Sequence, residues 1–269
     1  MAYGVVGLKT HCKAALVIRR EGRGLRSYAH LGTGNYNPKT ARIYTDLGLL
    51  TDDPTLCADV TDLFNVLTGV ARKGTYRKLM VAPVGIRPGI TELIEQEAER
   101  HRNHGDGRIV LKMNALVDPA ITAALYAAGN SGVPIDLIAR GMCSVIPGLP
   151  RVSETIRVRS IVGRYLEHSR IYAFGQGDRE RIWIGSADLM ERNLDRRVET
   201  LTPVTDAVLQ ERLRRVLEVM LADDRRAWVL GADGEWRRVE TQLAEPPGLD
   251  TFETLMAAAV ASTTVTEAR

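Results

Sequence analysis

The chain has 269 residues, of which 45% are hydrophobic and 26% are charged, so it is long enough for one large or two medium domains. This composition excludes a disordered chain, and no apolar run approaches the roughly 18 residues of a membrane-spanning helix. Three cysteines without paired spacing and an N-terminus without a secretory pattern predict a cytoplasmic protein with neither a disulfide framework nor a zinc site.

The first predicted elements are two strands joined by a turn, at residues 14–18 and 25–31. Asp53 and Pro54 then supply a helix N-cap and a first helical residue, so we expect a helix to about residue 67. No flanking strand or helix precedes residues 14–18. This strand is therefore expected either to form the edge of a sheet or to belong to a domain that begins before the chain does.

From residue 79 onward, strands alternate with helices. We expect strands at residues 79–82, 109–113 and 135–139, and helices at about 89–102 and 118–128. Strands that alternate with helices of this length are typical of βαβ units, which indicates an α/β fold with a mainly parallel sheet.

The later elements are a second hairpin, a long helix and a small terminal hairpin. The second hairpin is predicted at residues 171–174 and 181–185, the helix from 204 to about 221, and the terminal turn at 232–234. Beyond Thr241 the sequence is polar and then rich in Ala, and no element is predicted there.

An internal repeat connects the two larger hairpins. A His-x-cation motif precedes each of them, with His11 and Lys13 in the first copy and His168 and Arg170 in the second. Each hairpin is followed by a loop of the type Gly-Thr/Ser-x-Asn/Asp, namely GTGN at residues 32–35 and GSAD at residues 185–188. Asn37 and Pro38 fit a cap and a first helical residue, so amides at this point could face an anion.

Paired His-x-cation motifs have a specific chemistry. One imidazole can attack phosphorus and carry a phosphoryl group while the other transfers a proton, and nearby cations neutralise the phosphate oxygens. A single His-x-Lys is explained by chance and packing, whereas a repeat with matching loops favours a site. His101 and His104, at the end of a charged helix, are expected to be solvated.

The cations favour an anionic ligand near the N-terminus. Residues 1–50 hold eight Lys or Arg and two acids, whereas residues 239–269 hold five acids and one Arg. Arg outnumbers Lys by 30 to 6. Two explanations fit this excess, a bias of nucleotide composition and the suitability of guanidinium for bidentate phosphate binding. Charge alone does not distinguish nucleic acid from nucleotide or inorganic phosphate.

Longer motifs resemble the polyphosphate kinase family, in order, from about residue 4 to residue 225. The matching stretches are THCK (10–13), YAHLGTGNYNPKTARIYTD (28–46), LIARGMCS (137–144), YLEHSR (165–170) and SADLMERNLDRRV (186–198). The wider relationship is to the phospholipase D superfamily, in which two His-x-Lys motifs meet across a pseudo-twofold axis. Arg170 departs from that pattern.

The resemblance implies an α/β, phospholipase-D-like fold with two pseudo-repeated lobes and mixed, mainly parallel sheets. The implied divisions are the C-terminal part of the first catalytic lobe (1–75), the second catalytic lobe (76–238) and a C-terminal tail (239–269). The first lobe is expected to be incomplete at its N-terminus, so the chain alone is expected to be nearly inactive, with residues 1–75 the first to be cut by a protease.

The implied reaction is reversible transfer of the terminal phosphoryl group of ATP to polyphosphate. His11 matches the phosphohistidine of the family and His168 its second catalytic histidine. Contacts with ATP or its phosphates are implied for His168 and for Lys13, Tyr44, Arg140 and Arg197. The expected supporting residues are His30, Asn35, Asn37, Ser186, Asp188 and Asn193. The alternatives without a function are a packed aromatic ring for Tyr44 and surface ion pairs for Arg140 and Arg197.

Mg²⁺ bound with ATP is the implied cofactor, and no metal ligand is expected in this chain because the magnesium-associated arginines of the family lie upstream. The expected partners are ATP or ADP, polyphosphate and a homo-oligomer, with no nucleic acid. Two alternatives remain open at this point. One is a phospholipase-D-like phosphodiesterase, and the other is a non-catalytic fragment that binds polyphosphate.

Overall fold

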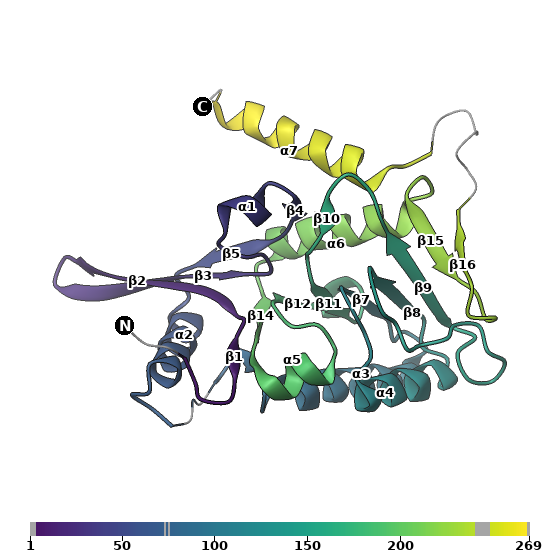
Figure 1. Cartoon of the computed structure of the whole chain (residues 1–269), viewed down its shortest axis with the longest axis horizontal. Helices are drawn as coiled ribbons and strands as arrows, with labels where there is room; N and C mark the ends of the chain where they lie inside the picture. The colour runs from purple at the N-terminus through teal and green to yellow at the C-terminus, as the bar shows by residue number, and fades with distance from the viewer. Residues whose placement is uncertain (1–3, 73, 75, 240–247, 268–269) are drawn as a thin grey trace.

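A computed structural model of the chain describes residues 4–72, 74, 76–239 and 248–267. Two regions are each built on a sheet of their own: the small-sheet region (residues 9–67) and the large-sheet region (residues 80–238). In Figure 1 the small sheet and its long hairpin lie on the left, and the large sheet with its covering helices lies on the right.

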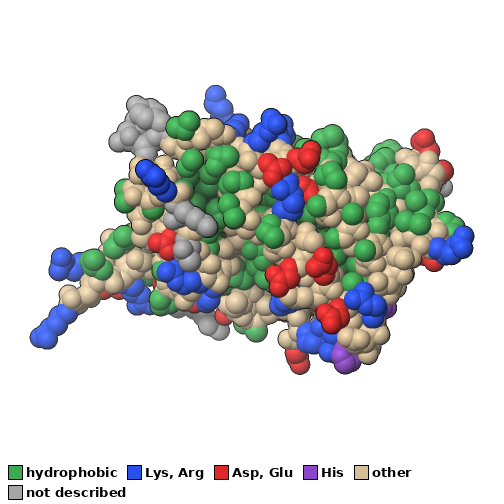
Figure 2. All heavy atoms as spheres, turned by 90° about the horizontal axis from the view of Figure 1, so that it is seen from below, with side chains coloured by type: hydrophobic (Ala, Val, Ile, Leu, Met, Phe, Trp, Pro, Cys, Tyr) green, Lys and Arg blue, Asp and Glu red, His purple; other side chains and the backbone are tan. Residues whose placement is uncertain are grey.

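The small sheet is antiparallel, with the order β2 (Lys13–Glu21), β3 (Gly24–Gly32) and β5 (Gly48–Thr51). The first predicted hairpin is confirmed, and its first strand lies at the edge of this sheet. Helix α2 (Pro54–Leu67) packs on the sheet and begins as predicted, since the Asp53 side chain accepts a hydrogen bond from the Leu56 amide. The far end of the β2–β3 hairpin projects from the body, and Figure 2 shows Lys and Arg side chains there.

Among the described residues, the large sheet has nine strands. Their order is β16 (Trp236–Arg238), β15 (Ala227–Leu230), β9 (Ile156–Ile161), β8 (Ile135–Ala139), β7 (Ile109–Met113), β11 (Ile171–Phe174), β12 (Arg181–Gly185), β14 (Thr200–Val204) and β6 (Met80–Val81). The α/β class, the second hairpin and the terminal hairpin are confirmed.

The pairing of this sheet is mixed and not mainly parallel. Strands β7, β8 and β9 pair in parallel, while their neighbours on both sides pair antiparallel. The cause is local, because β11–β12 and β15–β16 are joined by short turns, which permit only antiparallel pairing.

Helices cover both faces of the large sheet. Helices α3 (Ile86–His104) and α4 (Pro119–Asn130) bury their apolar side chains against one face, and α6 (Ala207–Ala222) covers the other (Figure 1). Helix α3 starts three residues before the predicted start, because Pro88 is tolerated in a first helical turn. Helix α6 starts later than expected, since Val204 ends a strand and Asp206 is the N-cap.

Several elements have no counterpart in the sequence prediction. Strand β9 carries Arg157 and Arg159, which hide its apolar alternation. The others include β5, β14, η1 (Gly177–Arg179), α5 (Glu191–Arg196) and α7 (Thr251–Glu267). None of the helices in the described ranges combines the length and the hydropathy needed to cross a membrane.

Two pairs of very short parallel strands join the small-sheet region to the large-sheet region. Strand β1 (Lys9–Thr10) pairs with β13 (Arg197–Val198), and β4 (Tyr44–Thr45) pairs with β10 (Leu166–Glu167). Between β3 and β4 lies the single turn of helix α1 (Pro38–Ala41).

A buried carboxylate also ties α2 to the segment that enters the large sheet. Asp59 is fully buried and accepts hydrogen bonds from the backbone amides of Arg77, Lys78 and Leu79, at 2.7 to 3.0 Å. Its neighbour on the helix, Asp62, is partly exposed and pairs only with the Arg77 side chain, at 3.2 Å, among the contacts of the described residues.

We expect Asp59→Ala to lower the free energy of unfolding by about 3 kcal/mol, because it leaves buried amides unpaired. The matched substitution Asp62→Ala is expected to cost less than about 1 kcal/mol, as is usual for an exposed ion pair. Urea denaturation of the two variants measures the difference, and equal losses would contradict the anchoring role.

Candidate active site

The two repeated motifs begin at equivalent points of the fold. His11 follows β1 and donates its backbone N–H to the carbonyl of Val198, at 3.0 Å. His168 follows β10 and donates its backbone N–H to the carbonyl of Thr45, at 2.9 Å. Each histidine therefore lies at the end of a short strand that is paired with the other region of the chain.

His11 lies between a carboxylate and an ammonium group. Its Nδ1 is 2.9 Å from the carboxylate of Glu199, and Lys13 Nζ lies 3.0 Å from its Nε2 and 3.2 Å from its Nδ1. If Nδ1 carries the proton that Glu199 accepts, Nε2 is unprotonated and its lone pair accepts from Lys13 Nζ, so the carboxylate fixes both the tautomer and the ring orientation.

Glu199 is itself fully buried and held in place by its neighbours. Ser186 Oγ donates to Glu199 Oε2 at 2.5 Å, and Asn193 Nδ2 donates to Oε1 at 2.8 Å. Arg197 approaches the same carboxylate at 3.8 Å. Two of the expected supporting residues and one expected phosphate contact therefore surround the acid that orients His11.

Lys13 is a buried cation in a crowded electrostatic environment. Burial lowers its pKa to about 8, the charge of Glu199 opposes this, and the charges of Arg170 and Arg197 add to it. The ammonium group is thus still charged near pH 7, but it is poorly solvated. An anion that neutralised this cluster would be strongly favoured at this point.

His168 lies beside a cation and has no carboxylate at hydrogen-bonding distance among the described residues. Arg170 approaches His168 Nδ1 at 2.8 Å and forms a two-pronged ion pair with Asp188, at 3.1 and 2.9 Å. Burial lowers the pKa of His168 to about 3, and the charges of Arg170, Lys13 and Arg140 contribute in that order. The imidazole is therefore neutral at pH 7. The influence of Lys13 on this pKa also places the two motifs in one electrostatic site.

Tyr44 and Arg140 complete the surroundings of His168. The Tyr44 ring stacks on the imidazole with centroids 4.6 Å apart and an angle of 20°. Arg140 donates to the carbonyl of Glu167 at 3.0 Å and to Asn114 Oδ1 at 2.5 Å. Tyr44 therefore lies on the His168 ring, and Arg140 is bound to the backbone of the residue before His168.

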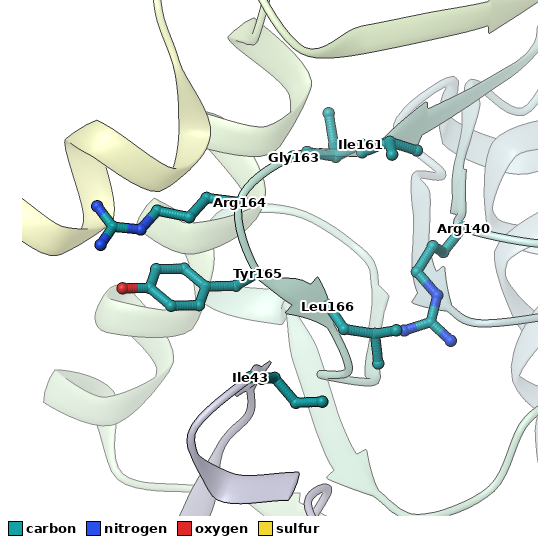
Figure 3. Close-up of a pocket in the computed structure, with 8 residues that line it drawn as sticks. Ile43, Arg140, Ile161, Gly163, Arg164, Tyr165 and Leu166 are labelled. Carbon is teal, nitrogen blue, oxygen red and sulfur yellow. The ribbon is translucent and has the colours of Figure 1, made fainter.

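A cavity of about 290 Å³ opens beside Arg140. In Figure 3, Arg140 lies on the right, Leu166 near the centre and Ile43 below them. Arg164 and Tyr165 extend to the left. The guanidinium of Arg164 lies over the Tyr165 ring, 5.4 Å from its centroid. The cavity thus combines apolar walls with two cations, Arg140 and Arg164.

The remaining expected supporting residues lie in the small sheet and the loop after it. His30 contacts the Tyr36 hydroxyl at 2.5 Å and lies against Gly48. Asn35 is partly buried in the loop after β3. Asn37 caps α1 with its own side chain, which accepts from the amides of Lys39 and Thr40. The predicted cap and first helical residue are confirmed, and the cap side chain occupies the amides of Lys39 and Thr40 in this structure.

Three charged residues of this site were not anticipated from the sequence. They are Glu199, Glu167 and Lys112, all of which are buried. Lys112 had a visible signal, since a lysine within the apolar run IVLKM has to find a partner inside the protein. Within the residues that the structure describes, no group of three or more His, Cys, Asp or Glu could hold a metal ion.

Comparisons with known proteins agree on one family. The family model "Polyphosphate kinase C-terminal domain 1" matches residues 1–73, and "Polyphosphate kinase C-terminal domain 2" matches residues 79–247. A polyphosphate kinase of Streptomyces coelicolor is 52% identical over 247 residues, which are 92% of this chain and 33% of that protein. A polyphosphate kinase of Synechocystis is 53% identical over 265 residues, which are 98% of this chain and 36% of that protein.

A solved structure is similar over nearly the whole chain. The crystal structure of a polyphosphate kinase from Porphyromonas gingivalis superposes with a TM-score of 0.89 at 36% identity, over 97% of this chain and 40% of that one. The chain thus spans about a third of the length of the curated relatives cited above.

The low pKa of His168 predicts a specific dependence of stability on pH. The unfolded chain binds a proton at this residue near pH 6.5, whereas the folded chain does so only near pH 3. The unfolded state therefore binds more protons between these values, so stability falls as the pH is lowered from 6.5 towards 3.

We expect His168→Asn to reduce the slope of unfolding free energy against pH, between pH 6 and 4.5, by about 1.4 kcal/mol per pH unit. His104→Asn, at the exposed end of α3, is the matched control and should keep the wild-type slope. Denaturant unfolding at a series of pH values measures this, and an unchanged slope in His168→Asn would contradict a buried neutral imidazole.

Proposed function

The chain belongs to the polyphosphate kinase family, and on this premise we propose that it carries a phosphoryl-transfer centre in which His11 accepts the terminal phosphoryl group of ATP and passes it, reversibly, to polyphosphate. The observation that carries this proposal is the contact between His11 Nδ1 and the buried carboxylate of Glu199. It leaves Nε2 as the nucleophile in a region rich in buried cations.

The proposed transfer has two displacement steps. In the first, the lone pair of His11 Nε2 attacks the γ-phosphorus, an N–P bond forms, and the bond from phosphorus to the bridging oxygen breaks with its electron pair leaving on ADP. The Nδ1 proton stays hydrogen bonded to Glu199, whose carboxylate offsets the positive charge that develops on the ring. In the second step, a terminal oxygen of polyphosphate attacks the phosphorus of the phosphohistidine, a P–O bond forms, and the N–P bond breaks with its electron pair returning to Nε2, which restores the imidazole.

Cations from both regions stabilise the phosphoryl group during its transfer. Lys13 lies at the His11 ring, and Arg170 lies between His168 and the carbonyl of Thr33. Preorganised charges of this kind stabilise a metaphosphate-like transition state without having to reorient. Arg140 and Arg197 are proposed to bind the remaining phosphates, and Mg²⁺ is proposed to enter with the nucleotide, as part of the substrate.

His168 is proposed to act as a proton carrier and a phosphate ligand. A neutral imidazole at pH 7 can donate from one nitrogen and accept at the other, which suits a group that serves both directions of a reversible transfer. Its partner Tyr44 offers an aromatic face for a base, and the cavity beside Arg140 is lined by Leu166 of β10, the strand that ends just before His168. We place this reaction in the cytoplasm, where ATP and ADP are available.

Although turnover by the chain alone is expected to be very slow, a single phosphoryl group held on His11 needs no turnover. We therefore expect the purified chain, on prolonged incubation, to acquire label from γ-labelled ATP in an acid-labile, base-stable form, as a phosphoramidate does, and His11→Ala to abolish that label. Acid and base stability of the protein-bound label, followed after gel separation, is the measurement. His104→Ala serves as the control and should retain the label. Label that persists in His11→Ala would refute the assignment, and a wild-type chain that takes up no label would refute the proposed function for this chain.

A further inference from the structure

A second buried carboxylate lies next to His168 and does not touch it. Glu167 accepts a hydrogen bond from Thr45 Oγ1 at 2.8 Å, from Ser169 Oγ at 2.6 Å and from the Ser169 amide at 3.2 Å. Lys112 Nζ lies 3.1 Å from the same carboxylate and donates to the carbonyl of Ser169 at 2.5 Å. Glu167 and Lys112 are 3% and 1% exposed, so both charges lie in the interior.

This carboxylate acts on both sides of the stacked pair. Thr45 immediately follows Tyr44, whose ring stacks on His168, and Glu167 and Ser169 flank His168 in the chain. The Thr45–Glu167 bond joins β4 of the small-sheet region to β10 of the large-sheet region. It therefore adds a side-chain bond to a strand pair of only two residues each, and so helps to fix Tyr44 relative to His168.

The other half of the repeat provides an internal comparison. In the β1–β13 pair, the positions equivalent to Glu167 and Thr45 are Thr10 and Val198. There the same parallel pairing forms without a buried charge. Since burying an ion pair costs desolvation energy, strand pairing alone does not explain Glu167. The carboxylate occurs only in the half of the repeat that has the aromatic stack.

We propose that Glu167 is a positioning residue for the nucleotide, acting through Thr45 to hold the Tyr44 ring against His168 so that both groups face the same ligand. The proposal rests on the proposed function, which gives this site a nucleotide to bind. Lys112 supplies the countercharge that keeps Glu167 ionised, and burial lowers the pKa of Lys112 to about 8, so the pair is charged at pH 7.

The test substitutes Thr45 and not Glu167, because a change of Glu167 would leave the buried Lys112 unpaired and would destabilise the folded state. Thr45→Val removes only the hydroxyl, and Thr45→Ser keeps it. The matched control is Thr155→Val. Thr155 is also partly buried and donates one hydrogen bond, at 3.1 Å to the carbonyl of Gly129. It lies just before β9, whereas Arg140 follows the adjacent parallel strand β8, so the two residues are at opposite ends of these strands.

Two measurements on the full chain keep the test decisive. Equilibrium binding of ADP is expected to weaken about tenfold in Thr45→Val, the scale of one lost hydrogen bond to a charged group, and to stay within about twofold of wild type in Thr45→Ser and Thr155→Val. Independently, NMR of histidine-labelled protein without nucleotide reports the ring-current shift that Tyr44 imposes on His168, whose signal is assigned with His168→Asn.

The His168 signal should lose this shift in Thr45→Val and keep it in Thr45→Ser and Thr155→Val. Unchanged ADP binding in Thr45→Val, or an unchanged His168 signal, would overturn the positioning role. If the wild-type chain fails to bind ADP, the proposed function fails for this chain. If, in that case, the His168 signal shifts in Thr45→Val and in neither of the other two variants, the Thr45–Glu167 hydrogen bond is a structural link between the two regions, and its proposed role in nucleotide binding is rejected.

Discussion

The repulsion between buried cations is the constraint on which this site depends. Five cationic side chains lie near the two histidines, and three buried carboxylates compensate them: Lys13, Lys112, Arg140, Arg170 and Arg197 against Glu199, Glu167 and Asp188. Unpaired charges of this kind would destabilise the interior by several kcal/mol each. The net positive charge that remains is most strongly neutralised by a bound polyanion, and a phosphate chain has the charge to do this.

The two halves of the repeat share a backbone plan but differ in their electrostatics. His11 has the carboxylate of Glu199 on its ring nitrogen, whereas His168 has the guanidinium of Arg170. The position equivalent to Glu199, one residue beyond the paired strand, is Asp46, which is exposed and lies against Gly34. This asymmetry supports different proposed roles, because a carboxylate stabilises the cationic ring of a phosphohistidine, while a nearby guanidinium keeps an imidazole neutral.

The sequence was sufficient for those parts of the fold that are governed by local periodicity. Strands β7, β8, β11 and β12 fall on the predicted residues, because each is a short apolar run between turns. Strand β9 was missed, because Arg157 pairs with Asp136 and Arg159 caps carbonyls at the end of α6, and neither partner is visible in a local window. Helix α7 has a stretch of Ala and Thr without a polar face, so no period indicates it.

The sequence predicted the two histidines of the site through their repeated motifs, but it did not predict the buried carboxylates Glu199 and Glu167. His11 and His168 could be found because the same spacing occurs twice. Glu199 lies 188 residues from His11, and only the β1–β13 pairing brings the two together. Contacts of this range depend on tertiary structure, and two-residue strands give no sequence signal of their own.

The strand pairs β1–β13 and β4–β10 also explain why the site depends on both regions together. The small-sheet region supplies His11 and Tyr44, while the large-sheet region supplies their partners Glu199 and His168. Any displacement of one region relative to the other therefore loosens the orientation of the nucleophile and the aromatic stack at the same time. Phosphoryl transfer depends on positioning more than on covalent chemistry of the protein. A junction that fixes both histidines at once is consequently the structural feature on which activity of this kind would depend most directly.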